Sequence, residues 1–346
     1  MNSFIQKIPS KIKWTLLFVF LSLLLLVGYL LHSFYGYNVN KDFALFIRTN
    51  ATFEEVQDSL QKNHVLKDLG NFIFLSKLLK YNQLVKPGHY KLTKGMSLMS
   101  LVKKLRAGNQ DPVKIRFESK RLVTDIFNEL DKQLELTAQQ LSDAAFHPDF
   151  LQKHQLTPQT LISIFIPNTY EVYWNIKPEK LLEFFVQERN KFFAKHRKQL
   201  EILGMNELQI SILASIVEAE TYQDAEKKRI AGVYYNRLKK NMRLQADPTV
   251  IFAMGDFTKT RVLKSDLQID SPYNTYKYSG LPIGPINAPG IASLEAALYP
   301  ESHNFIFFCA KPDFSGYHDF SSDYNEHLKQ AKAYQMALDK LNIHTH

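Results

Sequence analysis

The sequence of 346 residues contains one cysteine, Cys309, so no disulfide can form within the chain. The fold must be held by packing, and a lone cysteine near the C-terminus is typical of a small buried hydrophobic side chain rather than a nucleophile. The 11 histidines fall into no metal-ligand spacing such as HExxH, and the GxSxG, Walker A and GxGxxG patterns are missing. The sequence therefore predicts no metal and no cofactor.

The chain also lacks the stripe of Lys and Arg that is typical of nucleic-acid binding proteins, so no nucleic-acid partner is predicted. Its 43 Lys and Arg residues still outnumber its 34 Asp and Glu residues and give a formal net charge of +9. This balance favours anionic surroundings such as phospholipid headgroups or an acidic polymer. Hydrophobic residues make up 45% of the chain, which is ample for folded domains, and the length suits about two of them.

Charged residues are missing from Trp14 to Asn40. The segment "WTLLFVFLSLLLLVGYLL" (14–31), extended through Tyr35, reaches the roughly 20 apolar residues that cross a bilayer. A cleaved signal peptide is the alternative, but the apolar core is longer than usual and "HSFYGYN" offers no small-x-small cleavage site. The sequence therefore predicts a retained transmembrane helix over residues 14–35.

The orientation of this helix follows from the lysines around it. Lys7, Lys11 and Lys13 precede the apolar segment closely, and the next lysine is Lys41. Because positive charge stays on the cytoplasmic side, we expect a cytoplasmic tail over residues 1–13 in the cytoplasmic membrane. The bulk of the chain is then expected outside the cytoplasm, in a periplasmic or extracytoplasmic location.

Beyond the apolar segment, residues 42–110 show the pattern of a small βααβ-type module. "ALFIRTN" alternates like a strand, and "ATFEEVQDSLQKN" predicts a helix with Thr52 as its cap and Glu55 at the third position. A second helix in "NFIFLSKLLKY", a strand in "VKPGHYKLTKG" and a helix ending at Gly108 complete the module. Residues 111–346 are expected to form a mixed domain, so the predicted fold class is α+β.

Two glutamates stand in an otherwise apolar helical segment, "ILASIVEAET" (212–221). At 100° per residue, Glu218 and Glu220 fall about 160° apart, on opposite flanks of the apolar stripe. Partial desolvation there raises the pKa of a carboxyl group toward neutrality, which suits a general acid. The alternative is that one or both form structural ion pairs at the margin of the helix.

The next helical segment, "EKKRIAGVYYNRLKK", carries Arg237 inside its apolar stripe. A guanidinium that faces a core must be paired, and we expect Glu220 or Asp247 as its partner. This pairing would leave Glu218 free of a salt bridge.

Two polar loops follow. "MRLQADPTV" places Gln245, Asp247 and Thr249 in a turn, and "SPYNTYKYSGLPIGPINAPG" has the Gly and Pro density of a rigid loop. The tyrosines of that loop suit stacking on sugar rings, although for each one alone a folding role is the favoured explanation: Tyr273, Tyr276 and Tyr278. His318 in "GYHDFS" could touch a substrate, but we expect it to satisfy a backbone carbonyl.

These stretches resemble a known family. "LASIVEAET", "VYYNRL", "MRLQADPTVIFAMG", "YNTYKYSGLPIGPINAPGIASLEAAL" and "GYHDFS" follow the order and spacing of the YceG-like family of bacterial endolytic murein transglycosylases. "KPGHYKLTKGMSLMSLVKKLRAG" is similar to the LysM-like module of that family, and the N-terminal anchor matches too. "FIPNTYEVYW" is similar to its Pro-Asp-Thr-Tyr motif, with Asn168 where the family usually has Asp.

The resemblance implies an activity and a catalytic residue. Glu218 matches the family's catalytic glutamate, which cleaves the β-1,4 bond between N-acetylmuramic acid and N-acetylglucosamine in nascent peptidoglycan and leaves a 1,6-anhydro end. Glycan strands and the membrane are the expected partners, together with cell-wall synthases, and the cleavage would end strand elongation. The remaining motif residues would bind substrate or support the site: Glu220, Asn236, Arg237, Gln245, Asp247, Thr249, Tyr273, Asn274 and Tyr276.

Two other functions stay open at this point. One is a non-catalytic peptidoglycan-binding scaffold for the synthases. The other is a muramidase that hydrolyses the same bond with water. A hydrolase would need a second carboxylate about 5 to 10 Å from the first, for which Asp247 is the candidate in the motifs.

Overall fold

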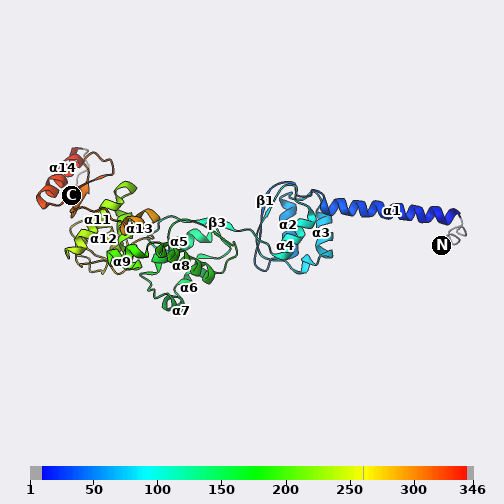
Figure 1. Cartoon of the computed structure of the whole chain (residues 1–346), viewed down its shortest axis with the longest axis horizontal. Helices are drawn as coiled ribbons and strands as arrows, with labels where there is room; N and C mark the ends of the chain where they lie inside the picture. The colour runs from blue at the N-terminus through cyan, green and yellow to red at the C-terminus, as the bar shows by residue number, and fades with distance from the viewer. Residues whose placement is uncertain (1–9, 260, 341–346) are drawn as a thin grey trace. The chain divides into compact units, whose positions relative to one another are not determined.

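The computed structural model describes residues 10–259 and 261–340 and contains two compact units. Unit 1 is the chain up to Lys114 together with Glu171–Asn175, and unit 2 is formed by Ile115–Tyr170 and the chain from Ile176 onward. Residues 1–9 of the predicted cytoplasmic tail and the last six residues of the predicted second domain lie outside the described residues. Figure 1 draws both units and labels most of their helices, together with β1 and β3.

Unit 1 begins with helix α1 (Ser10–Tyr35). Within the described residues, one helix is long and apolar enough by itself to cross a membrane, and it covers Lys11–Tyr35 of α1. Its length and composition suit a single-pass anchor and also suit a signal sequence. The C-terminal end of α1 belongs to the folded module, because Phe34 is buried in the core of unit 1 and Leu30 packs against that core.

The remainder of unit 1 has the predicted β-α-α-β order, followed by a third helix. Its elements are β1 (Phe43–Ile47), α2 (Phe53–Lys62), α3 (Leu69–Leu78), the short η2 (Tyr81–Gln83), β2 (Gly88–Leu92) and α4 (Leu98–Ala107). The two strands pair antiparallel, with Phe43 opposite Leu92 and Ile47 opposite Gly88. The likeness of this module to LysM remains a prediction from the sequence.

Local chemistry sets the ends of these helices as the sequence predicts. The Glu55 amide donates to Thr52 Oγ1 at 3.2 Å, and the Thr52 amide donates to the Glu55 carboxylate at 2.8 Å, so the predicted capping box on α2 is confirmed. Helix α4 ends at Gly108, whose φ of 73° lies in the left-handed region that glycine adopts without strain.

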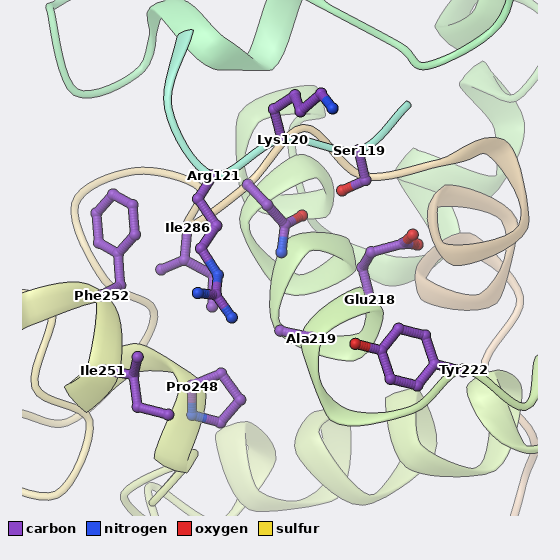
Figure 2. Close-up of a pocket in the computed structure, with 11 residues that line it drawn as sticks. Ser119, Lys120, Arg121, Glu218, Ala219, Tyr222, Pro248, Ile251, Phe252 and Ile286 are labelled. Atoms are coloured by element: carbon purple, nitrogen blue, oxygen red, sulfur yellow. The ribbon is translucent and has the colours of Figure 1, made fainter. Parts of the chain in front are cut away.

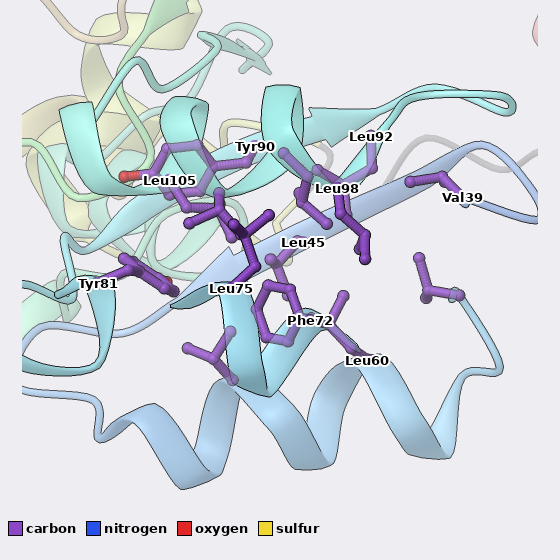
Figure 3. Packing of buried hydrophobic residues seen from close by; sticks show 14 of the residues in the cluster. Val39, Leu45, Leu60, Phe72, Leu75, Tyr81, Tyr90, Leu92, Leu98 and Leu105 are labelled. Carbon is purple, nitrogen blue, oxygen red and sulfur yellow. The ribbon is translucent and has the colours of Figure 1, made fainter. Parts of the chain in front are cut away.

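The core of unit 1 lies between its helices and the β1–β2 pair (Figure 3). Leu45 of β1 points inward, and Phe72 and Leu75 of α3 meet it from the helical side. Tyr81 and Tyr90 close one end, and all five side chains are fully buried. Unit 1 therefore has a complete apolar core of its own.

Unit 2 is mostly helical, with short strands. Its helices are α5 (Val123–Asp131), α6 (Ala138–Ala145), α7 (Pro148–Lys153), α8 (Pro178–Ala194), α9 (Arg197–Leu203), α10 (Glu207–Glu220), α11 (Asp224–Lys239), α12 (Asp247–Met254), α13 (Ile291–Leu298) and α14 (Tyr324–Lys340), with short η3 (Leu161–Ile164) and η4 (Asp266–Gln268). The strands β5 (Phe307–Ala310) and β6 (His318–Ser321) form a two-stranded sheet of this unit. The strands β3 (Val113–Arg116) and β4 (Thr169–Val172) form another two-stranded sheet, and the division after Lys114 and Tyr170 assigns their residues partly to each unit. The predicted α+β class is confirmed.

Helix α10 is the centre of unit 2. Every residue from Ile210 to Val217 is buried, because α11, α12 and α13 pack around this helix. The Ser215 hydroxyl accepts the Ile286 amide at 3.0 Å, and the Ser215 carbonyl accepts the Asn287 side-chain amide at 2.8 Å. These bonds fasten the Gly- and Pro-rich loop to α10, just before the turn that carries the two glutamates.

Candidate active site

The last turn of α10 presents Glu218 and Glu220 to two separate pockets. Glu218 lines one pocket and Glu220 lines the other. The prediction that the two carboxylates lie on opposite flanks of the helix is therefore confirmed. The two side chains therefore do not lie on the same face of α10.

The pocket around Glu218, called the Glu218 pocket below, has a volume of about 230 Å³. Its walls come from the loop after β3, the end of α10, the first turns of α12 and the loop that Ser215 fastens. Figure 2 shows Glu218 and Arg121 on opposite sides of this pocket. The lining residues are Ser119, Lys120, Arg121, Glu218, Ala219, Tyr222, Pro248, Ile251, Phe252, Ile286 and Asn287.

Two side chains hold the Glu218 carboxylate. The Ser293 hydroxyl donates a short hydrogen bond to Oε2, and the buried Lys227 ammonium lies 3.4 Å from the same oxygen. Lys227 also pairs with Asp224 at 2.8 Å. The expectation that Glu218 is free of a salt bridge is therefore wrong, and the ion-pair alternative describes its contacts.

The position of Lys227 explains this correction. Lys227 lies three residues before Ile230 and so belongs to the same apolar stripe of α11 that carries Arg237. A buried ammonium needs a carboxylate, and Glu218 and Asp224 supply two. The same helical periodicity that places Arg237 in the apolar stripe also places Lys227 there.

The N-terminus of α13 adds to the surroundings of Glu218. A Cβ on Gly290, the residue before α13, would lie 3.6 Å from Glu218 Oε2, so the carboxylate sits beside the first turn of that helix. The free amides of a first turn carry partial positive charge. The Glu218 carboxylate thus has Ser293 and Lys227 at Oε2 and the first turn of α13 beside both of its oxygens.

The second pocket, called the Glu220 pocket below, has a volume of about 440 Å³. Burial raises the pKa of Glu220 to about 7, and nearby Asp247 acts in the same direction, whereas the hydrogen bond from Tyr234 and the charge of Arg237 oppose the rise. The lining residues are Glu220, Arg237, Leu244, Gln245, Asp247, Tyr276, Phe307, Phe308, Cys309, Ala310, His318, Tyr324 and His327.

Arg237 is buried but forms no ion pair with any described residue. Its guanidinium donates to the carbonyls of Ile306 and Leu244, both at 2.7 Å, and to Gln245 Oε1 at 3.2 Å. The predicted salt bridge to Glu220 or Asp247 is therefore wrong. The carbonyl of Leu244, seven residues along the chain, and that of the distant Ile306 satisfy this cation, and it acts on Glu220 only through the field of its charge.

Tyr276 and Asp247 meet on the wall of the Glu220 pocket. The Tyr276 hydroxyl donates to Asp247 Oδ1 at 2.5 Å. Burial, and after it this hydrogen bond, raises the pKa of Tyr276 far above its ordinary value. Gln245 lines the same wall. Five of the predicted residues therefore gather here, away from Glu218: Glu220, Arg237, Gln245, Asp247 and Tyr276.

Comparison with known proteins now decides the family. A model of the YceG-like family matches residues 45–333. This chain belongs to the YceG-like family. The resemblance in the sequence motifs is thereby confirmed.

Individual relatives agree with this membership of the YceG-like family. The chain is 31% identical over 307 residues to the endolytic murein transglycosylase of Bacillus subtilis, with 83% of each chain covered. It is 28% identical over 334 residues to the enzyme of that name from Streptococcus pneumoniae, covering 84% of this chain and 60% of that relative. The crystal structure of a YceG-like protein from Listeria monocytogenes matches with a TM-score of 0.56 at 29% identity, covering 84% of this chain and 98% of the other.

The other four predicted residues of this YceG-like chain line neither pocket. Asn236 donates to the carbonyls of His303 and Phe305, and Asn274 donates to those of Leu267 and Ile269. The Thr249 hydroxyl donates to the Ala246 carbonyl, and Tyr273 packs on Phe252 with ring centroids 4.7 Å apart. These four side chains hold the loops and the start of α12 in place.

Sequence reasoning missed several residues of the Glu218 pocket. Arg121 and Tyr222 line this pocket, and Ser293 bonds to Glu218. All three stand outside the two polar loops of the sequence, and the local pattern around them gives no sign that they converge on Glu218. His318 differs from expectation as well. Its Nδ1 lies 2.9 Å from Glu226 Oε2 instead of meeting a backbone carbonyl, because the buried Glu226 requires a partner.

Proposed function

We propose that this YceG-like protein is a membrane-anchored endolytic murein transglycosylase. It would cut the β-1,4 bond between N-acetylmuramic acid and N-acetylglucosamine in nascent glycan strands and end their elongation. The relatives of that name, matched over most of the chain, support the activity. The observation that carries the mechanism is that Glu218 is the one carboxylate among the described residues lining its pocket.

Glu218 would act first as an acid and then as a base. As an acid it gives its proton to the glycosidic oxygen while the bond from that oxygen to C1 of the muramic acid breaks. The 6-hydroxyl of the same sugar then bonds to C1, and its proton passes to the Glu218 carboxylate. The products are a 1,6-anhydro end and a new free hydroxyl, no water is consumed, and Glu218 regains its proton.

A single carboxylate suffices for this route. A hydrolytic glycosidase needs a second carboxylate to activate water or to bond to the sugar. Asp247, the candidate for that role, lines the Glu220 pocket instead of the Glu218 pocket. The arrangement around Glu218 therefore favours the transglycosylase over the muramidase.

The Glu220 pocket favours one second candidate. It places two carboxylates, Glu220 and Asp247, on one cavity, and the pKa of about 7 for Glu220 suits a general acid at neutral pH. A muramidase acting there would use Glu220 as the acid and Asp247 as the base. Its products would carry reducing ends.

Retention of α1 as an anchor has support from the core of unit 1. Removal of α1 as a signal peptide would take Phe34 and Leu30 away from that core and expose apolar surface. With Lys11 and Lys13 before the apolar stretch, the N-terminus would lie in the cytoplasm and both folded units outside it. Cell-wall synthases in the same membrane are the proposed partners.

The end groups of the products test the proposed reaction. We expect the full-length protein in detergent to release fragments that end in 1,6-anhydromuramic acid from uncrosslinked glycan, as measured by mass spectrometry. Fragments with reducing ends, each 18 Da heavier by one water, would instead support the muramidase. Glycan binding without cleavage would contradict both enzymatic activities and support the non-catalytic scaffold instead.

Two cations, Lys120 and Arg121, line the Glu218 pocket. Of these, Arg121 forms no ion pair with any described residue. Its guanidinium lies over the Phe257 ring at 5.0 Å and donates to the Phe257 carbonyl at 3.3 Å, whereas neighbouring Lys120 pairs with Glu129 at 2.9 Å. Peptidoglycan stem peptides carry carboxylates. We infer that Arg121 binds such a group on the strand being cut.

Arg121→Gln is therefore expected to lower kcat/KM about tenfold on strands that carry stem peptides, the size of one charge-assisted hydrogen bond. Strands stripped of peptides should be cut at the wild-type rate. The matched control is Arg116→Gln, since Arg116 is exposed and lines neither pocket. An equal loss on both kinds of strand would contradict the role given to Arg121.

A further inference from the structure

We propose that helix α3 of unit 1 lies on the outer surface of the bilayer, with Phe74 and Leu78 inserted at the boundary between headgroups and acyl chains. The partner is the lipid surface itself. This inference rests on the anchoring part of the proposed function, and it is independent of the chemistry at Glu218. It adds a second membrane contact beside α1 and sets the orientation of unit 1 relative to the bilayer.

One face of α3 is apolar and open. Phe72 and Leu75 point into the core of unit 1, whereas the side chains of Phe74 and Leu78 remain 54% and 62% exposed. These two residues are four apart and so share one face of the helix, with Lys77 beside them. The helix sequence "LGNFIFLSKL" contains no acidic residue.

The depth of this face follows from α1. Counted from Trp14, about 20 helical residues cross the hydrocarbon of a bilayer, so α1 leaves the hydrocarbon near Phe34. The Phe34 ring stacks on the Phe74 ring with centroids 6.1 Å apart. Leu30, one turn deeper in α1, also packs against the core of unit 1. Contacts with α1 therefore hold α3 at the level where the hydrocarbon ends.

The chemistry around this level suits lipid headgroups. Tyr35 and Tyr37, which follow Phe34, are 60% and 78% exposed, and tyrosine favours the interface between hydrocarbon and water. Lys77 can meet a lipid phosphate while Phe74 and Leu78 enter the apolar layer, which is the arrangement of a helix lying in the interface. An apolar face that would be costly in water is then covered without a second protein.

Lipid quenching of single fluorescent labels tests this inference in the full-length chain. In a Cys309→Ser background, one cysteine is introduced by Phe74→Cys, Leu78→Cys, Leu24→Cys or Phe46→Cys and carries an environment-sensitive dye. The labelled proteins are reconstituted into vesicles of phosphatidylethanolamine and phosphatidylglycerol that contain quencher lipids. Phe46 is the matched control because it is 46% exposed on β1 of the same unit, and Leu24 reports whether α1 is in the bilayer.

We expect quenching at positions 74 and 78 to exceed that at position 46 about threefold, with position 24 strongly quenched. Quenching at position 24 together with equal, weak quenching at positions 74, 78 and 46 would contradict the contact of α3 with the bilayer but leave the anchoring by α1 intact. No quenching at 24 would overturn the anchor as well. Quenching at 74 that vanishes as protein density in the vesicles rises would mean that a second copy covers this face, which also contradicts the proposal.

Discussion

Replacement of Glu218 by glutamine is expected to lower kcat for glycan cleavage about 10³-fold, because an amide can neither give nor take the proton on which both steps depend. Glutamine keeps the size of the side chain and can still accept from the Ser293 hydroxyl, so the pocket should keep its shape. Single-turnover release of 1,6-anhydro ends, followed by mass spectrometry, measures the loss.

Two other glutamates make this result specific. Glu295→Gln changes an exposed residue of α13 that lines neither pocket, and its rate should equal that of the wild type. The Glu220→Gln variant shows which of the two pockets holds the catalytic acid. If the Glu218→Gln protein retains a tenth or more of the activity and the Glu220→Gln protein has lost it, the catalytic acid is Glu220 and not Glu218.

The second large effect concerns stability, since Glu220→Gln is expected to stabilise unit 2 by about 3 kcal/mol above pH 7. Burial raises the pKa of Glu220 from an ordinary 4.5 to about 7. Between these two values the folded chain holds a proton that the unfolded chain has released. The stability associated with protonated Glu220 is therefore complete below pH 4.5, falls as the pH rises toward 7, and is absent above it.

Glutamine removes this dependence on pH, because it stays neutral and still accepts from the Tyr234 hydroxyl. The difference in unfolding free energy between variant and wild type should be near zero at pH 4 and largest at pH 8. Hydrogen exchange of the α10 amides is the suitable measurement, since Trp14 and Trp174 both belong to unit 1 and their fluorescence reports on that unit. A variant no more stable than the wild type at pH 8 would show that Glu220 is ionised at little cost in the folded chain.

Much of the local structure could be predicted because its causes are local. Thr52 and Glu55 cap α2 through bonds within one turn, and Gly108 ends α4 because glycine accepts the left-handed conformation there. The opposite flanks of Glu218 and Glu220 follow from the 100° step of a helix. In each of these features, the interacting groups lie within a few residues of one another in the sequence.

The partners of charged side chains could not be predicted in this way. Helical periodicity placed Arg237 in the core of unit 2, but its acceptors are the carbonyls of Leu244 and Ile306 rather than a carboxylate. In the same way, Glu218 meets Ser293 from α13 and Lys227 from α11. The direction of a side chain is a local property, and the group that it meets depends on how distant segments pack.

The sequence by itself determined the apolar segment, the order of elements in the module, the family motifs and the helix that carries both glutamates. Only the tertiary structure decided that these glutamates serve two separate pockets, that Asp247 lies with Glu220 and that Arg121 faces Glu218. The physical reason is that a pocket is made by segments brought together through burial of apolar surface elsewhere. The core around α10 brings together α10, α12 and the Gly- and Pro-rich loop. The loop after β3 joins them through the bond from the Ala288 amide to the Lys120 carbonyl.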